Sequence, residues 1–343
     1  MTTQFWIPPV TKASDGQNRR VGFEIEFGNV SVSETAHALA ETLGGELQES
    51  NPFIFQLQTE DLGTLRIERD TELLNTVRYR EFLGQLNIDF DEGTVAREIE
   101  QGVDRLSSSL VPCEIVTAPL EFSQFRRLHD IVQCLNQLGA TGTQDSLINA
   151  YGTHLNPSIP ELSAATIRNY MQVFLLLSDW IIKDSNTDFS RRYFTRFIDP
   201  FPKAFLEHVL DMEYQPGEDK LIADYLRHNP TRNRALDLLP MLSEIDSATV
   251  QANVKSSERS LIKKRPAFHY RLPDCRLGDA DWSIANEWNR WWYVEAIASH
   301  DTLREELIRQ WQSQQQKFLL PFSGDWIHRV TRFINKHIAP PES

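Results

Sequence analysis

The 343-residue sequence predicts an α+β fold built around a mostly antiparallel sheet. Most of its strand-like segments alternate apolar and polar residues, and few are continuous apolar runs. Such alternation is typical of an antiparallel or mixed sheet with one apolar and one polar face. Segments with helical periodicity separate the strands and dominate the second half of the chain. The chemistry is therefore expected on the polar face of the sheet.

Strand character is confined to short segments. They are residues 21–27, 53–58, 63–69, 113–120, 148–156 and 267–272. Gly63 is placed to close a turn between two of these strands, and Pro119 and Pro157 are placed to end two others. These segments supply the strands of the predicted sheet.

Helical periodicity marks longer segments. They are residues 33–43, 95–110, 122–138, 163–182, 283–299, 301–318 and 326–337. Ser33 is the expected N-cap of the first helix, and Gly44 ends it. Helix 163–182 is apolar on more than one side, so we expect it to be buried. The Trp-rich helix 283–299 is expected in the core rather than at a subunit interface.

The chain divides into an arm, a main domain and a tail. Residues 1–18 are expected to form a loose N-terminal arm, and residues 301–343 to form C-terminal helices. Residues 19–300 make up the main domain, in which 184–264 is an insertion of short helices punctuated by prolines. The sequence leaves oligomerisation open.

Composition excludes several classes of partner. A net charge of −13 disfavours nucleic acids and anionic membrane surfaces, because both attract a surplus of Lys and Arg. The 3 cysteines form no C-x-x-C pair and are expected to be reduced thiols. No signal-peptide pattern and no apolar stretch of membrane-spanning length is evident. We expect a cytoplasmic protein.

The segment GFEIEF (22–27) places two carboxylates on one strand face. Glu24 and Glu26 point away from Phe23 and Ile25, and two residues span about 6.6 Å along a strand. Carboxylates at that spacing can flank one or two divalent cations, and Mg²⁺ prefers oxygen ligands. For this segment alone, a solvated strand face is the alternative interpretation.

The acidic pattern recurs on two other strands. Glu68 and Asp70 share one face of the segment IERD, and Glu114 begins an otherwise apolar strand. An acid buried without a partner is costly, and a cation would supply the partner for Glu114. A salt bridge from Glu114 to an arginine is the alternative.

Nitrogen-bearing side chains occur on the strand GTHLN. His154 and Asn156 share one face of this strand, and Gly152 permits a close backbone approach. His154 could ligate a metal through a neutral ring nitrogen or donate to a phosphate. A structural histidine is the alternative.

Arginines supply candidate anion ligands. Arg271 lies on the polar face of segment 267–272, next to His269, and could clamp a phosphate bidentately. Arg232 and Arg234 precede an apolar run and are further candidates for phosphate or carboxylate binding. Surface arginines are the alternative for this second pair.

Taken in order, these motifs resemble the amidoligase family, within the superfamily of glutamine synthetase and glutamate–cysteine ligase. The matching segments are GFEIEF, RIERDTEL, EIVTAPL, YGTHLNPS, RALDLLP and HYRLPDCRL. The resemblance spans most of the chain. It implies a curved sheet of the glutamine-synthetase type with helices packed on its outer face, and it makes residues 19–300 the catalytic domain.

The resemblance also implies roles for individual residues. The implied metal ligands are Glu24, Glu26, Glu114 and His154. The implied ATP-binding residues are His154, Asn156, Arg234 and Arg271. The implied catalytic residues are Arg271, Glu68 and Asp70. The expected ion is Mg²⁺, with Mn²⁺ as an alternative.

The sequence departs from the family pattern in two places. His269 stands where the family commonly has a glutamate, which removes one possible metal ligand and leaves the number of ions open. The acidic D-x-S position of the family is occupied by Asp70-Thr71-Glu72.

The implied activity is an ATP- and Mg²⁺-dependent ligation of a carboxylate, on a small molecule or peptide, to an amine through an acyl phosphate. The sequence contains no P-loop, G-x-G-x-x-G or G-x-S-x-G motif, so phosphate binding falls to metals and arginines. Two alternatives stay open. One is a metal-dependent amide hydrolase, and the other is a catalytically silent binding module on the same fold.

Overall fold

The computed structural model describes residues 4–51, 53–69, 112–145, 151–185, 198–317 and 323–341. The predicted helix 95–110 and the candidate residue Asp70 lie outside these ranges. So do residues 148–150, which begin one of the predicted strands.

The described strands form one antiparallel sheet. They are β1 (Arg20–Phe27), β2 (Glu46–Asn51), β3 (Ile54–Thr59), β4 (Gly63–Arg69), β5 (Cys113–Thr117), β6 (Leu120–Glu121), β7 (Thr153–Pro157), β8 (Leu236–Asp237) and β9 (His269–Tyr270). Their order is β2-β3-β4-β5-β1-β7-β9-β8, and β6 pairs with β1. The prediction of an α+β fold with an antiparallel sheet is confirmed. The curvature expected for a sheet of the glutamine-synthetase type stays a prediction.

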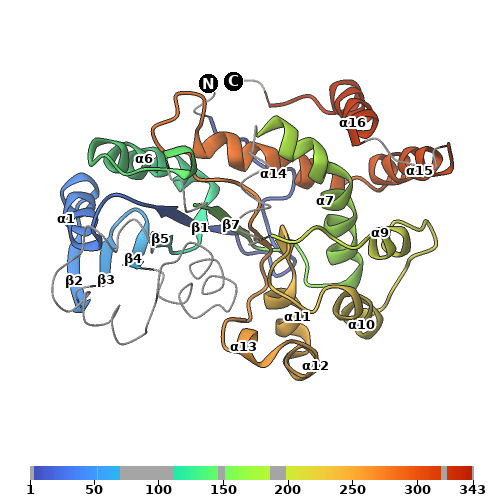
Figure 1. Ribbon diagram of the computed structural model, residues 1–343, viewed down its shortest axis with the longest axis horizontal. Helices are drawn as coiled ribbons and strands as arrows, with labels where there is room; N and C mark the ends of the chain where they lie inside the picture. Colours follow the sequence, from blue (N-terminus) through green and yellow to red (C-terminus); the bar gives the residue numbers. More distant parts are fainter. Residues whose placement is uncertain are drawn as a thin grey trace, which may run out of the picture.

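Helices lie on both sides of this sheet. They are α1 (Val32–Leu43), α6 (Leu128–Gln137), α7 (Ala164–Asp184), α9 (Lys203–Val209), α10 (Glu218–His228), α11 (Leu239–Ile245), α12 (Ser247–Asn253), α13 (Ser256–Arg259), α14 (Ile284–Ala298), α15 (Asp301–Lys317) and α16 (Ser323–His337). In Figure 1, α6 and α14 lie above the sheet and α11, α12 and α13 lie below it. None of the helices in the described ranges has the length and apolar character needed to cross a bilayer.

The apolar face of β1 belongs to the core. Phe23, Ile25 and Phe27 are fully buried. The Phe23 ring packs edge-on against Phe125, with 5.1 Å between ring centroids, and Phe125 packs in the same way against Trp288 of α14. Because side chains alternate along a strand, this burial turns Glu24 and Glu26 to the opposite face.

Several predicted boundaries differ from the structure. The first helix is capped by Ser31 and not by Ser33, because the Ser31 and Glu34 side chains form a reciprocal capping box. Segment 122–138 begins as a 3₁₀-helix over Phe122–Arg127 before α6. Strand β2 was not expected, since ELQESN shows no apolar alternation. In segment 267–272, only His269 and Tyr270 form strand.

The N-terminal arm is fastened to the Trp-rich helix and is not loose. The indole Nε1 atoms of Trp288 and Trp292 donate to the carbonyls of Trp6 and Ile7, at 2.7 and 2.8 Å. Trp288 is fully buried, which confirms that this helix belongs to the core. A buried indole N–H needs an acceptor, and here the backbone of the arm provides it.

The predicted insertion is helical but also contributes to the sheet. Its described part, residues 198–264, contains α9 to α13 together with the edge strand β8. In β8, Asp237 lies opposite His269 of β9. Strand β8 thus brings the buried carboxylate of Asp237 to the sheet.

Candidate metal centre

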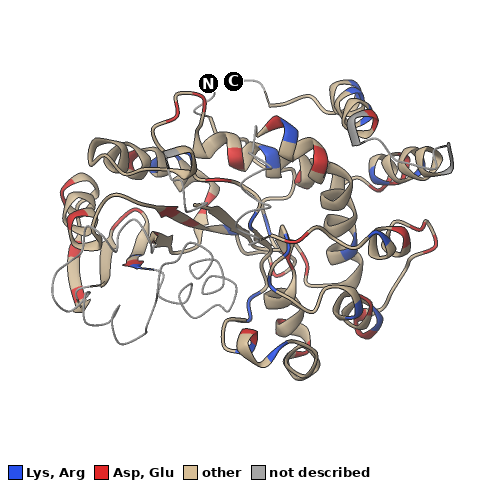
Figure 2. Ribbon diagram, viewed as in Figure 1, with Lys and Arg blue, Asp and Glu red and all other residues tan. Residues whose placement is uncertain are grey.

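A row of polar side chains crosses the central strands of the sheet. Glu24 lies opposite His154, and Glu26 lies opposite Glu114. On the next strand, Glu68 lies opposite Glu114. Directly opposed side chains of an antiparallel pair are neighbours, with their Cβ atoms about 5 Å apart. Acidic residues therefore occur on the central strands as well as on the outer helices (Figure 2).

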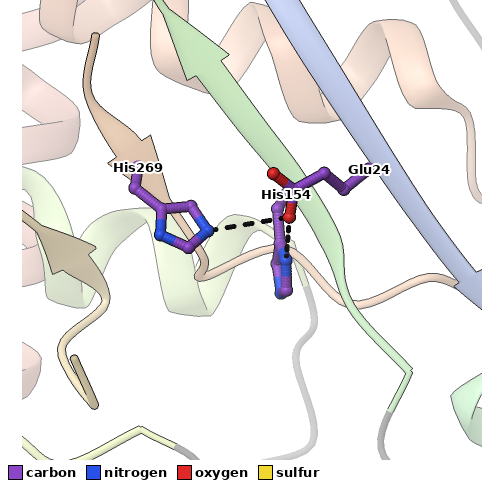
Figure 3. A group of neighbouring side chains, drawn as sticks. All are labelled: Glu24, His154 and His269. Carbon is purple, nitrogen blue, oxygen red and sulfur yellow. Dashed lines mark hydrogen bonds and ion pairs between the residues drawn. The ribbon is translucent and has the colours of Figure 1, made fainter. Parts of the chain in front are cut away.

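One candidate group consists of Glu24, His154 and His269 (Figure 3). One ligand atom from each residue lies within 4.8 Å of the others. His154 Nδ1 is 3.0 Å from Glu24 Oε2, and His269 Nε2 is 3.7 Å from the same oxygen. Three strands, β1, β7 and β9, each contribute one side chain.

A second group consists of Glu26, Glu114 and His154, with ligand atoms again within 4.8 Å of one another. His154 Nε2 is 3.8 Å from Glu26 Oε1, and the other Glu26 oxygen accepts a hydrogen bond of 2.7 Å from Gly152 N. The structure thus brings together all four predicted metal ligands. Carboxylate and imidazole groups are common ligands of divalent cations.

The donor set suits a bound cation. His269 is 3% exposed and Asp237 is fully buried. In the part of the chain that the structure describes, neither ring nitrogen of His269 makes a hydrogen bond, and neither does Asp237 Oδ2. Buried polar groups normally have partners, and a cation bound beside Glu24 would supply one for His269 Nε2.

Glu24 is held in its ionised form. Burial would raise the pKa of Glu24, but the neighbouring rings of His154 and His269 outweigh this and hold the pKa well below its usual value. A carboxylate that is already ionised at neutral pH can bind a cation without first losing a proton.

Asn156 positions Glu24. Asn156 Nδ2 donates to Glu24 Oε1 at 2.8 Å, and Asn156 Oδ1 accepts from Arg265 Nη2 at 2.7 Å. Both ends of the amide are therefore engaged within the protein. The structure supports a positioning role for Asn156, and its predicted contact with ATP stays a prediction.

Two arginines lie at the β8–β9 end of the row. Burial is the main cause that lowers the pKa of Arg271, and the neighbouring charge of Arg232 lowers it further. The carboxylates of Asp237, Glu26 and Glu24 raise it in part. Arg271 Nη1 donates to the carbonyl of Arg232 at 2.5 Å. Arg271 thus lies within electrostatic reach of the acidic row, and its catalytic and ATP-binding roles stay predictions.

The other predicted residues lie further from the two metal-ligand groups. Arg234 donates to the carbonyls of Pro200 and His228, which indicates a structural role. Glu68 is on the same sheet face as Glu114, one strand beyond it, and pairs with Arg66 at 2.5 Å. The catalytic role of Glu68 and the ATP-binding role of Arg234 stay predictions.

Gly152 leaves the space that His154 occupies. A Cβ atom at this position would lie 2.5 Å from His154 Nε2 and 3.3 Å from Glu26 Oε2. We expect Gly152→Ala to displace the imidazole and to lower Mn²⁺ affinity about tenfold, the lower end of the range for disturbed metal-site supports. Electron paramagnetic resonance of free Mn²⁺ measures this affinity.

Gly217→Ala is the matched control for this variant, because a Cβ atom at Gly217 meets nothing within 4 Å. Circular dichroism of both variants separates a local effect from unfolding. If Gly152→Ala binds Mn²⁺ as tightly as Gly217→Ala does, His154 is not a ligand.

Residues 17–293 match a family model described as "Putative amidoligase enzyme". The chain belongs to the amidoligase family. Membership of this family indicates a ligase, which agrees with the resemblance found in the motifs. No curated protein and no solved structure matches the chain.

In this member of the amidoligase family, the sequence motifs predict no role for several residues of the candidate centre. His269 replaces a glutamate of the family pattern and is expected to remove a ligand, yet its ring lies beside Glu24. No motif points to a role for Asp237 or Arg265. The alternation of Phe268 and Tyr270 with His269 placed His269 on the polar face, but nothing in the sequence paired its strand with β7 or β8.

Proposed function

We propose that this member of the amidoligase family is an ATP- and Mg²⁺-dependent carboxylate–amine ligase that works through an acyl phosphate. The observation that carries the proposal is the pair of metal-ligand groups that meet at His154 on one sheet face. Glu24, Glu26, Glu114 and His154 would hold Mg²⁺, which would supply positive charge against the phosphates of ATP. A sheet curved as in glutamine synthetase, a cytoplasmic location, and small-molecule or peptide substrates belong to the same proposal.

The chemistry begins with an unreactive carboxylate. A carboxylate oxygen of the substrate attacks the γ-phosphorus of ATP, and the bond from that phosphorus to the bridging oxygen breaks to release ADP. The amine then attacks the carbonyl carbon of the acyl phosphate. Phosphate departs with its bonding electron pair, and the amine nitrogen loses a proton. The products are an amide, ADP and phosphate.

The residues of the chain contribute by position and charge. Glu24, Glu26 and Glu114 provide anionic oxygens for cations on the sheet. Arg271 and Arg232 are adjacent positive charges at the β8–β9 end, and an anion between them would relieve their mutual repulsion. We assign Arg271 to the transferred phosphoryl group, where a guanidinium stabilises developing negative charge.

Hydroxylamine trapping tests the proposal without knowledge of the amine. The purified chain is incubated with ATP, Mg²⁺, hydroxylamine and a panel of amino acids, dicarboxylates and peptides. An acyl phosphate would react with hydroxylamine to form a hydroxamate, accompanied by an equal amount of ADP. Omission of ATP or Mg²⁺ should abolish the product.

The same assay separates the alternatives. Cleavage of an amide without ATP would instead identify a metal-dependent hydrolase. If no member of the panel stimulates ADP release and ATP does not bind, the chain is a binding module and the proposal is wrong.

A further inference from the structure

The two candidate groups offer different ligand atoms. Glu26, Glu114 and His154 combine two carboxylates with one imidazole, whereas Glu24, His154 and His269 combine one carboxylate with two imidazoles. Carboxylate oxygens suit Mg²⁺ and Mn²⁺, while imidazole nitrogens suit transition metals such as Co²⁺ and Zn²⁺. Ions bound at these two positions would therefore differ in preference.

His154 can serve only one of these positions as a neutral ligand. A neutral imidazole has one nitrogen with a free lone pair and one that carries hydrogen. Nδ1 lies at hydrogen-bond distance from Glu24 Oε2, 3.0 Å, while Nε2 is 3.8 Å from Glu26 Oε1. A carboxylate only accepts hydrogen bonds, so at this distance Nδ1–H donates to Glu24. The lone pair on Nε2 then faces Glu26 and Glu114.

This arrangement leaves His269 as the nitrogen ligand beside Glu24. That position then combines one carboxylate with one imidazole, whereas the position at Glu26, Glu114 and His154 combines two carboxylates with one imidazole and is richer in oxygen. Its Nδ1 is 3.5 Å from Asp237 Oδ2, and its Nε2 is 3.7 Å from Glu24 Oε2. Figure 3 shows the His269 ring directed toward the Glu24 carboxylate. A carboxylate behind an imidazole favours hydrogen on the nearer nitrogen and leaves the lone pair of the other nitrogen for a metal.

The surroundings of Asp237 support this role. Asp237 is fully buried, its Oδ1 accepts from Leu239 N at 2.9 Å, and its Oδ2 faces His269 and, at 3.8 Å, Arg232 Nε. A buried carboxylate needs such partners. Asp237 is thus a positioning residue for the His269 ring.

We propose that His269, oriented by Asp237, gives the ion position at Glu24 a preference for a transition metal over Mg²⁺. The inference builds on the proposed function, which places cations on this face of the sheet. It makes His269 a determinant of metal specificity, with Glu26, Glu114 and His154 forming the oxygen-rich position.

Cobalt titration tests the inference, because Co²⁺ is a transition ion whose visible absorption reports nitrogen coordination. Co²⁺ and Mg²⁺ affinities are measured by calorimetry, and Co²⁺ also by absorption, for the full chain and for His269→Glu. We expect the ratio of Co²⁺ to Mg²⁺ affinity to fall at least about tenfold in the variant, with a changed cobalt spectrum.

His300→Glu is the matched control, because His300 is exposed. The control should keep the ratio and the spectrum of the unchanged chain. His269→Gln is measured in parallel and should also lose the cobalt preference, which covers the case in which His269→Glu does not fold. The inference is wrong if the unchanged chain binds no Co²⁺, or if a folded His269 variant keeps the original ratio.

Asp237→Asn tests the positioning role. We expect a weaker Co²⁺ affinity, by about tenfold, with Mg²⁺ binding at the oxygen-rich position unchanged. A merely structural role for Asp237 would weaken both ions together.

The outcome is independent of the ligase assay, since metal titration needs neither ATP nor substrate. A cobalt preference that depends on His269, without ATP-dependent hydroxamate, would contradict the proposed function alone. Hydroxamate formation with an unaltered metal ratio in the variants would contradict this inference alone.

Discussion

Glu24→Gln is expected to lower ATP-dependent turnover by about 10²–10³-fold, the loss seen when one group that stabilises transition-state charge is removed. Glu24 lies between the imidazoles of His154 and His269 and also accepts a hydrogen bond from Asn156. The change is almost isosteric but removes the negative charge. The NH₂ group of the new amide would also replace one carboxylate oxygen, and it cannot accept the hydrogen bonds that this oxygen accepts.

Steady-state release of ADP with Mg²⁺-ATP and a hydroxamate-forming substrate measures the effect. Glu49→Gln provides the control, because Glu49 is exposed on the edge strand β2 and is expected to keep normal turnover. Circular dichroism should show the same fold for both variants. Full turnover in Glu24→Gln would end the assignment of Glu24 as a metal ligand.

Glu295→Ala is expected to destabilise the protein by about 3–5 kcal/mol, the usual cost of removing one partner from a buried ion pair. Arg19 donates to both carboxylate oxygens of Glu295, at 2.8 and 2.9 Å. Tyr170 Oη and Trp291 Nε1 donate at 2.7 and 2.9 Å. All lone pairs of the carboxylate accept hydrogen bonds. Removal of the carboxylate would leave the charge of Arg19 buried and without its ion-pair partner.

Urea unfolding followed by circular dichroism measures this loss as a shift in the midpoint. Glu207→Ala is the control, since Glu207 is exposed on α9 and its ion pair with Lys203 lies at the surface. Surface ion pairs contribute little, so we expect the control to change stability by less than about 1 kcal/mol. Equal midpoints for Glu295→Ala and Glu207→Ala would contradict the prediction.

The Glu295 network also anchors the residue that precedes β1. Arg19 additionally donates to the carbonyls of Val10 and Ser158, at 2.7 to 2.9 Å. The arm, the start of β1, α7 and α14 thus converge on one carboxylate. Because β1 carries Glu24 and Glu26, this anchoring holds the central strand of the candidate metal centre in place.

The sequence by itself determined which side chains share a face within each strand. Alternation along GFEIEF separated Glu24 and Glu26 from the core phenylalanines, because side chains of a strand point to opposite faces. The order of motifs added Glu114 and His154, and the structure places all four together. These inferences needed only local geometry and a resemblance.

Only the tertiary structure decided which strands are neighbours. His269 follows His154 by more than a hundred residues, and its strand has only two residues, so no local pattern reveals its pairing with β7 and β8. The buried partner Asp237 comes from a segment expected to be helical. Register between distant strands is set by packing of the whole sheet against its helices, so His269 and Asp237 could be assigned to the candidate metal centre only from the folded chain.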